Sequence, residues 1–285
     1  MKDKRKLLLG ILLILQLAVL LYFGSQKQGM HFDEYYSYFT TNNSDGRAVN
    51  DRQWLNSQDM KKDFYVQDGE QFQYEKVIQL QSYDVHPPVF YLLLHTLCSL
   101  MPGVYSIWQG LALNIMYALI ATVFLYLILD KLTHNQWAAF LIVLICITNP
   151  GVISNVMFIR MYMLLTMWMM IAIWLHLCMG EKWHWSFLLL NSALAYVGFL
   201  AHYYYLAFLF FLEAAYWLPR FRKEWKRFLL YGTSMLGAGA LAVFSYPACL
   251  GHIFAGYRGK QATGNLLNLT DIQARWLFFS GLMNK

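Results

Sequence analysis

Long apolar stretches constrain the fold of this chain more than any other feature of its sequence. They cover residues 7–23, 107–129, 137–148, 161–179, 187–200, 203–218 and 228–250. A helix needs roughly 20 apolar residues to cross about 30 Å of hydrocarbon. Only helices and closed barrels satisfy every backbone polar group inside a bilayer. The sequence therefore predicts an all-α polytopic membrane protein with about seven transmembrane helices.

The composition agrees with this class and argues against a nucleic-acid-binding protein. Of the 285 residues, 58% are hydrophobic and only 13% are charged, against about 45–50% and 25% in soluble domains. The net charge of +6 comes from basic residues at the ends of apolar stretches, so we expect no nucleic-acid partner. The four cysteines lie in apolar segments without CxxC or Cys/His spacing, so we predict neither a disulfide framework nor a metal site.

Basic residues set the expected topology. Residues 2–6 and 220–227 are rich in Lys and Arg. Residues 220–227 are expected to form a loop, and the positive-inside rule places both segments in the cytoplasm. A cleaved signal peptide is the alternative for residues 7–23, but this run is long for one and a weak cleavage site follows it, so we expect an uncleaved first helix. Residues 87–101 are short for a span and are expected to form an interfacial or half-inserted helix on the outer side.

The polar segments divide the chain into two parts. Residues 24–85 form the one long polar segment and are too rich in aromatic side chains for a disordered linker. They belong to an expected external loop, residues 24–106, that carries juxtamembrane helices. We group this loop with the membrane helices into one transmembrane domain, residues 1–250. Residues 251–285 are expected to be an external segment that leads toward a further C-terminal part.

An acidic pair follows the first helix. Asp33 and Glu34 lie in the aromatic stretch of residues 30–38, at or just above the membrane surface. In a strand or loop, adjacent side chains point apart, so we expect one carboxylate to face a site and the other to pack or to bond backbone. A solvated loop start is the alternative interpretation.

A histidine precedes a proline pair at the end of the external loop. Asp84 and His86 stand before Pro87 and Pro88. A residue before proline is held extended, so His86 is presented in a fixed direction at the membrane surface. The alternative is a histidine that caps the following helix.

Further polar residues lie at the ends of later apolar stretches. Arg160 stands at the mouth of the fourth stretch, which is costly for a cation unless it snorkels or binds an anion, and its planar fork suits a phosphate. His202 is expected to add a donor to the same anion or to belong to an interfacial aromatic belt. Glu213 lies nearer the cytoplasmic end and is expected to pair with Arg220 or Arg222.

Four motifs, in order, carry a family resemblance. They are Asp-Glu after the first helix (Asp33, Glu34), His-Pro-Pro (His86, Pro87, Pro88), Arg-Met-Tyr-x-Leu (Arg160, Met161, Tyr162, Leu164) and His-Tyr (His202, Tyr203). The chain resembles the GT-C superfamily of membrane glycosyltransferases, and within it the branch of protein O-mannosyltransferases and lipid A aminoarabinose transferases. Such enzymes usually continue through further membrane helices, so the chain looks like an N-terminal portion of a longer one. Some relatives have lysine where His86 stands, so the charge at this position depends on pH here.

The resemblance implies roles for individual residues. Asp33 would deprotonate an acceptor hydroxyl, with Glu34 as the second catalytic candidate. The phosphate of a polyprenyl-phosphate sugar donor would be bound by His86, Arg160, Tyr162 and His202. Asp84, Tyr35 and Tyr203 are expected to support these groups. No cofactor beyond the donor substrate is implied, and a divalent metal stays open because relatives differ on this point.

The expected function is therefore an inverting glycosyltransferase in the cell membrane, with a cytoplasmic N-terminus and a site on the outer face. Its expected partners are membrane lipids, the lipid-linked donor and a hydroxyl acceptor on a protein, a glycolipid or a wall polymer. One alternative is a transporter or flippase of lipid-linked or anionic solutes, although the sequence contains no internal repeat of the kind such proteins often have. The other is a truncated, non-catalytic remnant.

Overall fold

The computed structural model describes residues 2–43, 54, 56–179, 183–267 and 272–283, and within these residues every regular element is helical. In chain order the elements are α1 (Lys2–Gln26), α2 (Phe32–Asn42), α3 (Ser57–Lys61), η1 (Lys62–Phe64), α4 (Tyr74–Tyr83), α5 (Val89–Ser99), α6 (Ile107–Thr133), α7 (Gln136–Ile147), α8 (Pro150–Met157), α9 (Tyr162–Met179), α10 (Trp185–Ala201), α11 (Tyr204–Trp217), α12 (Phe221–Ser245), α13 (Ala248–Leu250), η2 (Gly251–Ala255), α14 (Tyr257–Leu267) and α15 (Ile272–Met283). The all-helical class predicted from the sequence is confirmed for this part of the chain.

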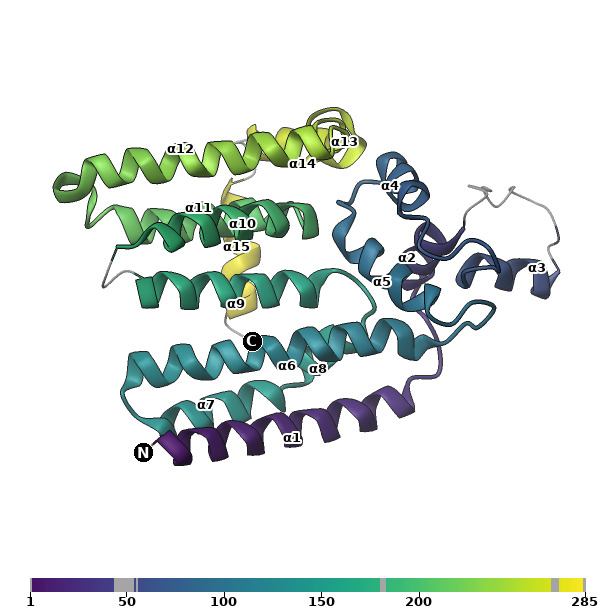
Figure 1. The fold of residues 1–285 in the computed structure, drawn as a ribbon, viewed down its shortest axis with the longest axis horizontal. Coiled ribbons are helices and arrows are strands. Elements are labelled where there is room, and N and C mark those ends of the chain that lie inside the picture. Colours follow the sequence, from purple (N-terminus) through teal and green to yellow (C-terminus); the bar gives the residue numbers. More distant parts are fainter. Residues whose placement is uncertain (1, 44–53, 55, 180–182, 268–271, 284–285) are drawn as a thin grey trace.

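The helices form two regions (Figure 1). The long helices α1, α6, α7 and α9–α12 lie side by side in a layered arrangement that we call the stack. In it α6 packs against α1, α7 and α9, and α10 packs against α9, α11 and α12. The short helices α2–α5 and η1 gather at one end of the stack and form a region that we call the lobe. The lobe therefore covers one end of the stack and leaves the other end free.

The membrane character predicted from the apolar stretches is visible in the helix lengths. Within the described residues, α1, α6 and α12 are long and apolar enough to cross a membrane, and the pair α7–α8, bent by 58°, would add a fourth span if its two helices act as one. Four further apolar helices, α5, α9, α10 and α11, are shorter. The number of about seven crossings therefore stays a prediction.

Local sequence signals set the break between α7 and α8. Asn149 accepts a hydrogen bond from the Gly151 amide at 2.8 Å and so caps α8. Pro150 occupies the first helical position, where a missing amide donor costs nothing. An N-cap followed by proline starts a new helix in a new direction, which explains why the third apolar stretch is bent.

The segments 220–227 and 87–101 are both largely helical in the structure. The basic segment 220–227 was expected to be a loop, but α12 already begins at Phe221 and only Glu224 has non-helical dihedral angles. Lys and Arg are good helix formers, and the Phe221 ring packs on Phe228 with centroids 5.0 Å apart. The segment 87–101 forms α5, whose 11 residues extend only about 16 Å. This helix packs in the lobe against α2, α4 and α6.

Candidate functional site

The break between α8 and α9 is where the lobe meets the stack. The Ile159 amide donates to Glu34 Oε1 at 2.8 Å, and its carbonyl accepts from the Ser37 hydroxyl at 3.0 Å. Asn114 on α6, fully buried, donates to the Phe158 carbonyl at 2.7 Å. Irregular backbone beside an apolar region needs such partners, because each unpaired amide or carbonyl is costly there. Two side chains of α2 and one of α6 therefore fix the position of the chain just before α9.

Glu34 has the more structural role of the acidic pair. Its buried carboxylate accepts from Lys27 Nζ at 3.0 Å, from the His31 amide at 2.6 Å and from the Ile159 amide. Together with the His31 side chain, which accepts from the Asp33 amide at 3.1 Å, it forms a capping box at the start of α2. The pair was expected in a strand or loop, but it lies in the first turn of a helix. The expectation that one carboxylate bonds backbone describes Glu34.

Asp33 keeps an accessible carboxylate. Its side chain is 48% exposed, and its carboxylate oxygen lies 3.7 Å from His31 Nδ1. Its backbone carbonyl accepts from Arg160 Nη1 at 3.1 Å, although the two residues are 127 positions apart in the chain. Of the two carboxylates, Asp33 is thus the one with room to exchange a proton with another molecule.

Arg160 is buried and lies among neutral acceptors. It is 5% exposed, and Nη1 also donates to the hydroxyls of Ser37 and Tyr91, both at 3.3 Å. Its Nε–H has no acceptor, and no carboxylate of the described residues lies within ion-pair distance of it. A guanidinium held rigidly without an anion beside it is suited to attract one.

His86 links Arg160 to Asp84. His86 Nδ1 lies 2.9 Å from Asp84 Oδ2, and His86 Nε2 lies 3.3 Å from Arg160 Nη2. A guanidinium can only donate, so Nε2 must accept and Nδ1 must carry the proton that goes to Asp84. His86 is therefore neutral in this arrangement. Burial would raise the pKa of Asp84, but the His86 hydrogen bond and the nearby positive charge outweigh it and lower that pKa.

His202 and Tyr162 lie beside the group formed by Arg160, His86 and Asp84, on the side of the stack. The His202 ring centroid lies 5.7 Å from that of Tyr162. Burial, together with the positive charge of the neighbouring Arg160, lowers the pKa of His202 to about 4. A neutral imidazole in the turn between α10 and α11 is the result. His202 Nδ1 accepts from the Tyr204 amide at 3.1 Å, so only its other nitrogen is free to donate.

Two residues expected to support the site face other neighbours. The Tyr35 ring packs on Phe39 and Phe64, with centroids 5.7 and 5.1 Å away, inside the lobe. The Tyr203 hydroxyl lies 2.8 Å from His252 Nδ1. Spacing in the sequence placed both tyrosines beside functional residues, but a helix turns neighbouring side chains in different directions.

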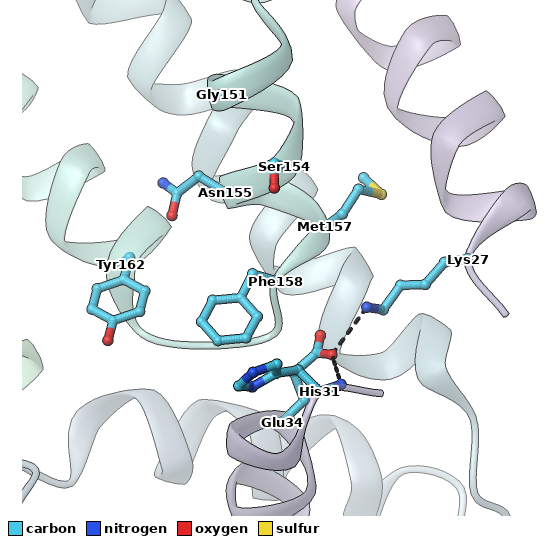
Figure 2. A pocket seen from close by; sticks show the side chains of 9 residues that line it. All are labelled: Lys27, His31, Glu34, Gly151, Ser154, Asn155, Met157, Phe158 and Tyr162. Atoms are coloured by element: carbon cyan, nitrogen blue, oxygen red, sulfur yellow. Dashed lines mark hydrogen bonds and ion pairs between the residues drawn. The ribbon is translucent and has the colours of Figure 1, made fainter. Parts of the chain in front are cut away.

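A cavity of about 460 Å³ opens next to Glu34, between the end of α1, the start of α2 and α8 (Figure 2). Its lining consists of Lys27, His31, Glu34, Gly151, Ser154, Asn155, Met157, Phe158 and Tyr162. Among the predicted site residues only Glu34 and Tyr162 line it. In Figure 2 Lys27, His31 and Glu34 meet on one side of the cavity, the Phe158 ring lies next to His31, and Tyr162 lies beyond Phe158.

The polar residues Lys27, His31 and Asn155 of this cavity were not among the residues predicted from the sequence. Lys27 is a single basic residue after an apolar helix, and His31 and Asn155 belong to no recognisable motif. The one available signal was the position of His31, three residues before a glutamate, which is the spacing of a capping box. In the described part of the chain, no group of three or more His, Cys, Asp or Glu side chains is placed to hold a metal ion.

The arrangement brings Asp33, Asp84, His86, Arg160, Tyr162 and His202 to one end of the stack, although they come from four separate parts of the chain. It combines an accessible carboxylate, a buried cation without a counterion and a polar cavity beside them. Comparison of the chain with family models, curated proteins and solved structures returns no match.

Proposed function

We propose that this protein is an integral membrane glycosyltransferase that moves a sugar from a polyprenyl-phosphate donor to a hydroxyl acceptor, with inversion at the anomeric carbon. In this proposal Asp33 is the base, and Arg160 is the main charge that faces the donor phosphate. The resemblance of the four motifs supplies the reaction class, and the geometry supplies the division of roles among the residues.

The observation that carries the proposal is the meeting of Asp33 and Arg160. The Asp33 carbonyl and Arg160 Nη1 are 3.1 Å apart, so a base and a phosphate-binding cation share one boundary between lobe and stack. A donor with its phosphate near Arg160 would present its sugar toward the lobe, where Asp33 is half-exposed. An acceptor hydroxyl between the sugar and Asp33 would then lie on the face opposite the phosphate.

One carboxylate suffices for this chemistry. A phosphate leaves without being protonated, so the general acid that glycosidases need is not required. Asp33 takes the hydroxyl proton while the new bond forms at the anomeric carbon and the bond to phosphate oxygen breaks. The leaving phosphate keeps the electron pair of that bond, and a guanidinium in a low-dielectric setting stabilises the charge.

The neutral state of His86 changes its proposed role. Because His86 Nε2 accepts from Arg160, the imidazole orients the guanidinium and offers no proton to a phosphate. Asp84 fixes the tautomer, as a carboxylate does for a metal-bound histidine. His86 and Asp84 therefore act through Arg160, while Tyr162 and Lys27 line the cavity and can meet the donor directly.

The membrane topology is part of the proposal. The helix α9 has 18 residues and would extend about 27 Å, close to the hydrocarbon thickness of about 30 Å. It lies alongside α6, which is long enough to span. With α10 and α11 also crossing, about seven crossings result. The N-terminus is then cytoplasmic, the lobe lies outside, and the prenyl tail lies between helices of the stack.

A pair of variants tests the role of Asp33. Asp33→Asn should lower sugar transfer by at least about 100-fold, the scale of general base catalysis, in protein reconstituted with a panel of polyprenyl-phosphate hexoses and pentoses. Asp68→Asn removes another carboxylate from an exposed position of the lobe and should leave transfer unchanged. Full transfer by Asp33→Asn would remove Asp33 from the mechanism, and no transfer by the wild-type protein with any donor would count against the proposal as a whole.

One observation favours the transporter alternative. Glu213, His176 and Tyr231 form a buried polar cluster within the stack, and ionisable residues inside membrane helices often belong to ion or proton pathways. Movement of a fluorescent lipid-linked sugar across vesicles that contain the purified protein, without sugar transfer, would support this second function.

A further inference from the structure

A second cavity lies between α9 and α11, far along α9 from Arg160. Its volume is about 290 Å³, and its lining consists of Ile173, His176, Leu177, Leu212, Ala215, Tyr216 and Arg220. Aliphatic side chains form most of this lining, and Arg220, at the end of α11, is its one arginine. The cavity thus combines an apolar wall with a single strong cation.

Arg220 has no acidic partner among the described residues. Its Nη1 donates to the Tyr216 carbonyl at 2.8 Å, and its guanidinium lies 4.3 Å from the centroid of the Tyr216 ring. Both contacts hold the side chain in place and neither cancels its charge. Arg220 is therefore oriented and still able to attract an anion.

Glu213, the residue expected to neutralise Arg220, is engaged elsewhere. Its carboxylate lies 3.1 Å from His176 Nε2 and accepts a hydrogen bond from the Tyr231 hydroxyl. Pairing of Glu213 with Arg220 or Arg222 is therefore a wrong prediction. Arg220 lies seven residues further along the chain, beyond the end of α11 at Trp217, and makes no ion pair with Glu213.

The surroundings of Arg220 are those of a membrane–water boundary with basic character. Arg222, Lys223 and Lys226 are exposed, while Arg227 pairs with Glu224 at 3.0 Å. Two tryptophans lie with these cations: Lys226 Nζ is 5.8 Å from the centroid of a Trp225 ring and the Arg227 guanidinium is 5.7 Å from that of Trp183. Tryptophan and basic clusters gather at bilayer interfaces, and such clusters attract anionic lipids.

We propose that the cavity between α9 and α11 binds one anionic phospholipid. Its phosphate would pair with Arg220, and part of an acyl chain would lie along Ile173, Leu177 and Leu212. A free phosphate would gain nothing from the apolar wall. A zwitterionic lipid would bring a cationic group into a segment that is already basic. This inference is independent of the proposed transferase activity, because it concerns the opposite end of the stack.

The test compares two arginines in the same segment. Arg220→Gln removes the cation that lines the cavity, and Arg222→Gln removes the same charge from an exposed position outside it. Native mass spectrometry of the purified full chain, titrated with phosphatidylglycerol or phosphatidylcholine, counts the bound lipids. We expect Arg220→Gln to lower phosphatidylglycerol occupancy about fivefold, the factor that corresponds to about 1 kcal/mol per basic residue near an anionic surface, and Arg222→Gln to change it less than twofold.

Further experiments distinguish lipid binding in this cavity from general attraction of anionic lipid to the basic segment. Ala215→Leu keeps Arg220 and fills the cavity, so it should also reduce phosphatidylglycerol retention, while millimolar glycerol phosphate should not displace the lipid. Arg220→Lys keeps the charge and should retain at least half of the binding, which also checks that loss in Arg220→Gln is not loss of the fold. Equal losses in Arg220→Gln and Arg222→Gln, or equal retention of phosphatidylcholine by the wild-type protein, would overturn the proposal.

Discussion

The two ends of α9 carry buried polar clusters that are built in opposite ways. Before its first turn, the cation Arg160 donates to a backbone carbonyl and to neutral side chains, and its Nε–H stays without an acceptor. Near its last turn, His176 bonds Glu213, which Tyr231 also bonds. The first cluster surrounds the break between α8 and α9, while the second joins regular helical turns of α9, α11 and α12.

This difference separates a cluster whose cation has no anion beside it from one whose acid has a histidine and a tyrosine as partners, although Glu213 Oε2 is itself without a hydrogen bond. At the break, side chains of α2 and α6 are used to satisfy backbone groups, and the cation is left without an anion. In the unbroken region the backbone satisfies itself, so side chains bond to one another and hold α9, α11 and α12 together. A ligand anion would therefore complete the Arg160 cluster, whereas it would have to compete with Glu213 at the other.

The largest expected effect is a difference in stability between variants of Glu34, which is fully buried, and of Glu213, whose side chain is 17% exposed. Glu34→Leu leaves Lys27 without its counterion and two amides without an acceptor, so we expect a loss of about 3–5 kcal/mol in the free energy of unfolding. Glu213→Leu removes only side-chain hydrogen bonds, to His176 and Tyr231, and leaves no backbone amide without an acceptor, so it should cost about 1–3 kcal/mol. Unfolding of both variants in mixed detergent micelles measures the difference, and a larger loss for Glu213→Leu would contradict the comparison.

The next effect tests how the Arg160 cluster responds to pH. The pKa of His202 is lowered to about 4 from an ordinary value near 6.5, so the unfolded chain takes up the proton first. Stability should be fully present above pH 6.5 and should fall as the pH drops toward 4, by up to about 3 kcal/mol for this group. We expect thermal unfolding of the wild-type protein to show this loss.

The variant His202→Asn isolates that contribution. Its amide oxygen can still accept from the Tyr204 amide, as His202 Nδ1 does, but it has no proton to gain in this range. The difference in unfolding temperature between the wild-type protein and His202→Asn should therefore change between pH 6.5 and 4. A constant difference over this range would show that His202 is not held neutral by its surroundings.

The sequence predicted the helices well because their signal is local. The apolar stretch 107–129 became α6, and 187–200 became most of α10. The order of the motifs and the expected topology also placed Asp33 and Arg160 on one face, and in the structure the two residues meet through the Asp33 backbone carbonyl. These features depend on apolar composition and on the positive-inside rule. Both can be applied to a single sequence.

The remaining features depend on tertiary contacts that no local pattern records. Glu213 was expected to pair with Arg220 or Arg222, which follow it closely in the sequence. Its partner is instead His176, which lies 37 residues earlier on another helix. The role of Glu34 was left open, because the amide that it accepts from is 125 residues away. The neutral form of His86 became visible only when Arg160 was found at its second nitrogen.

The smallest expected effect concerns the packing that holds the break in place. A methyl group at Gly110 on α6 would lie 2.3 Å from the Ile159 Cγ2 atom, so Gly110→Ala must push the chain before Arg160 away from α6. We expect a loss of about 1–3 kcal/mol, the usual cost of overpacking, and weaker sugar transfer because Arg160 moves with Ile159. Gly237→Ala on α12 meets nothing within 4 Å and should be neutral or stabilise slightly through helix propensity. If Gly110→Ala unfolded like Gly237→Ala and transferred sugar at the wild-type rate, close contact between α6 and the break would not be what positions Arg160.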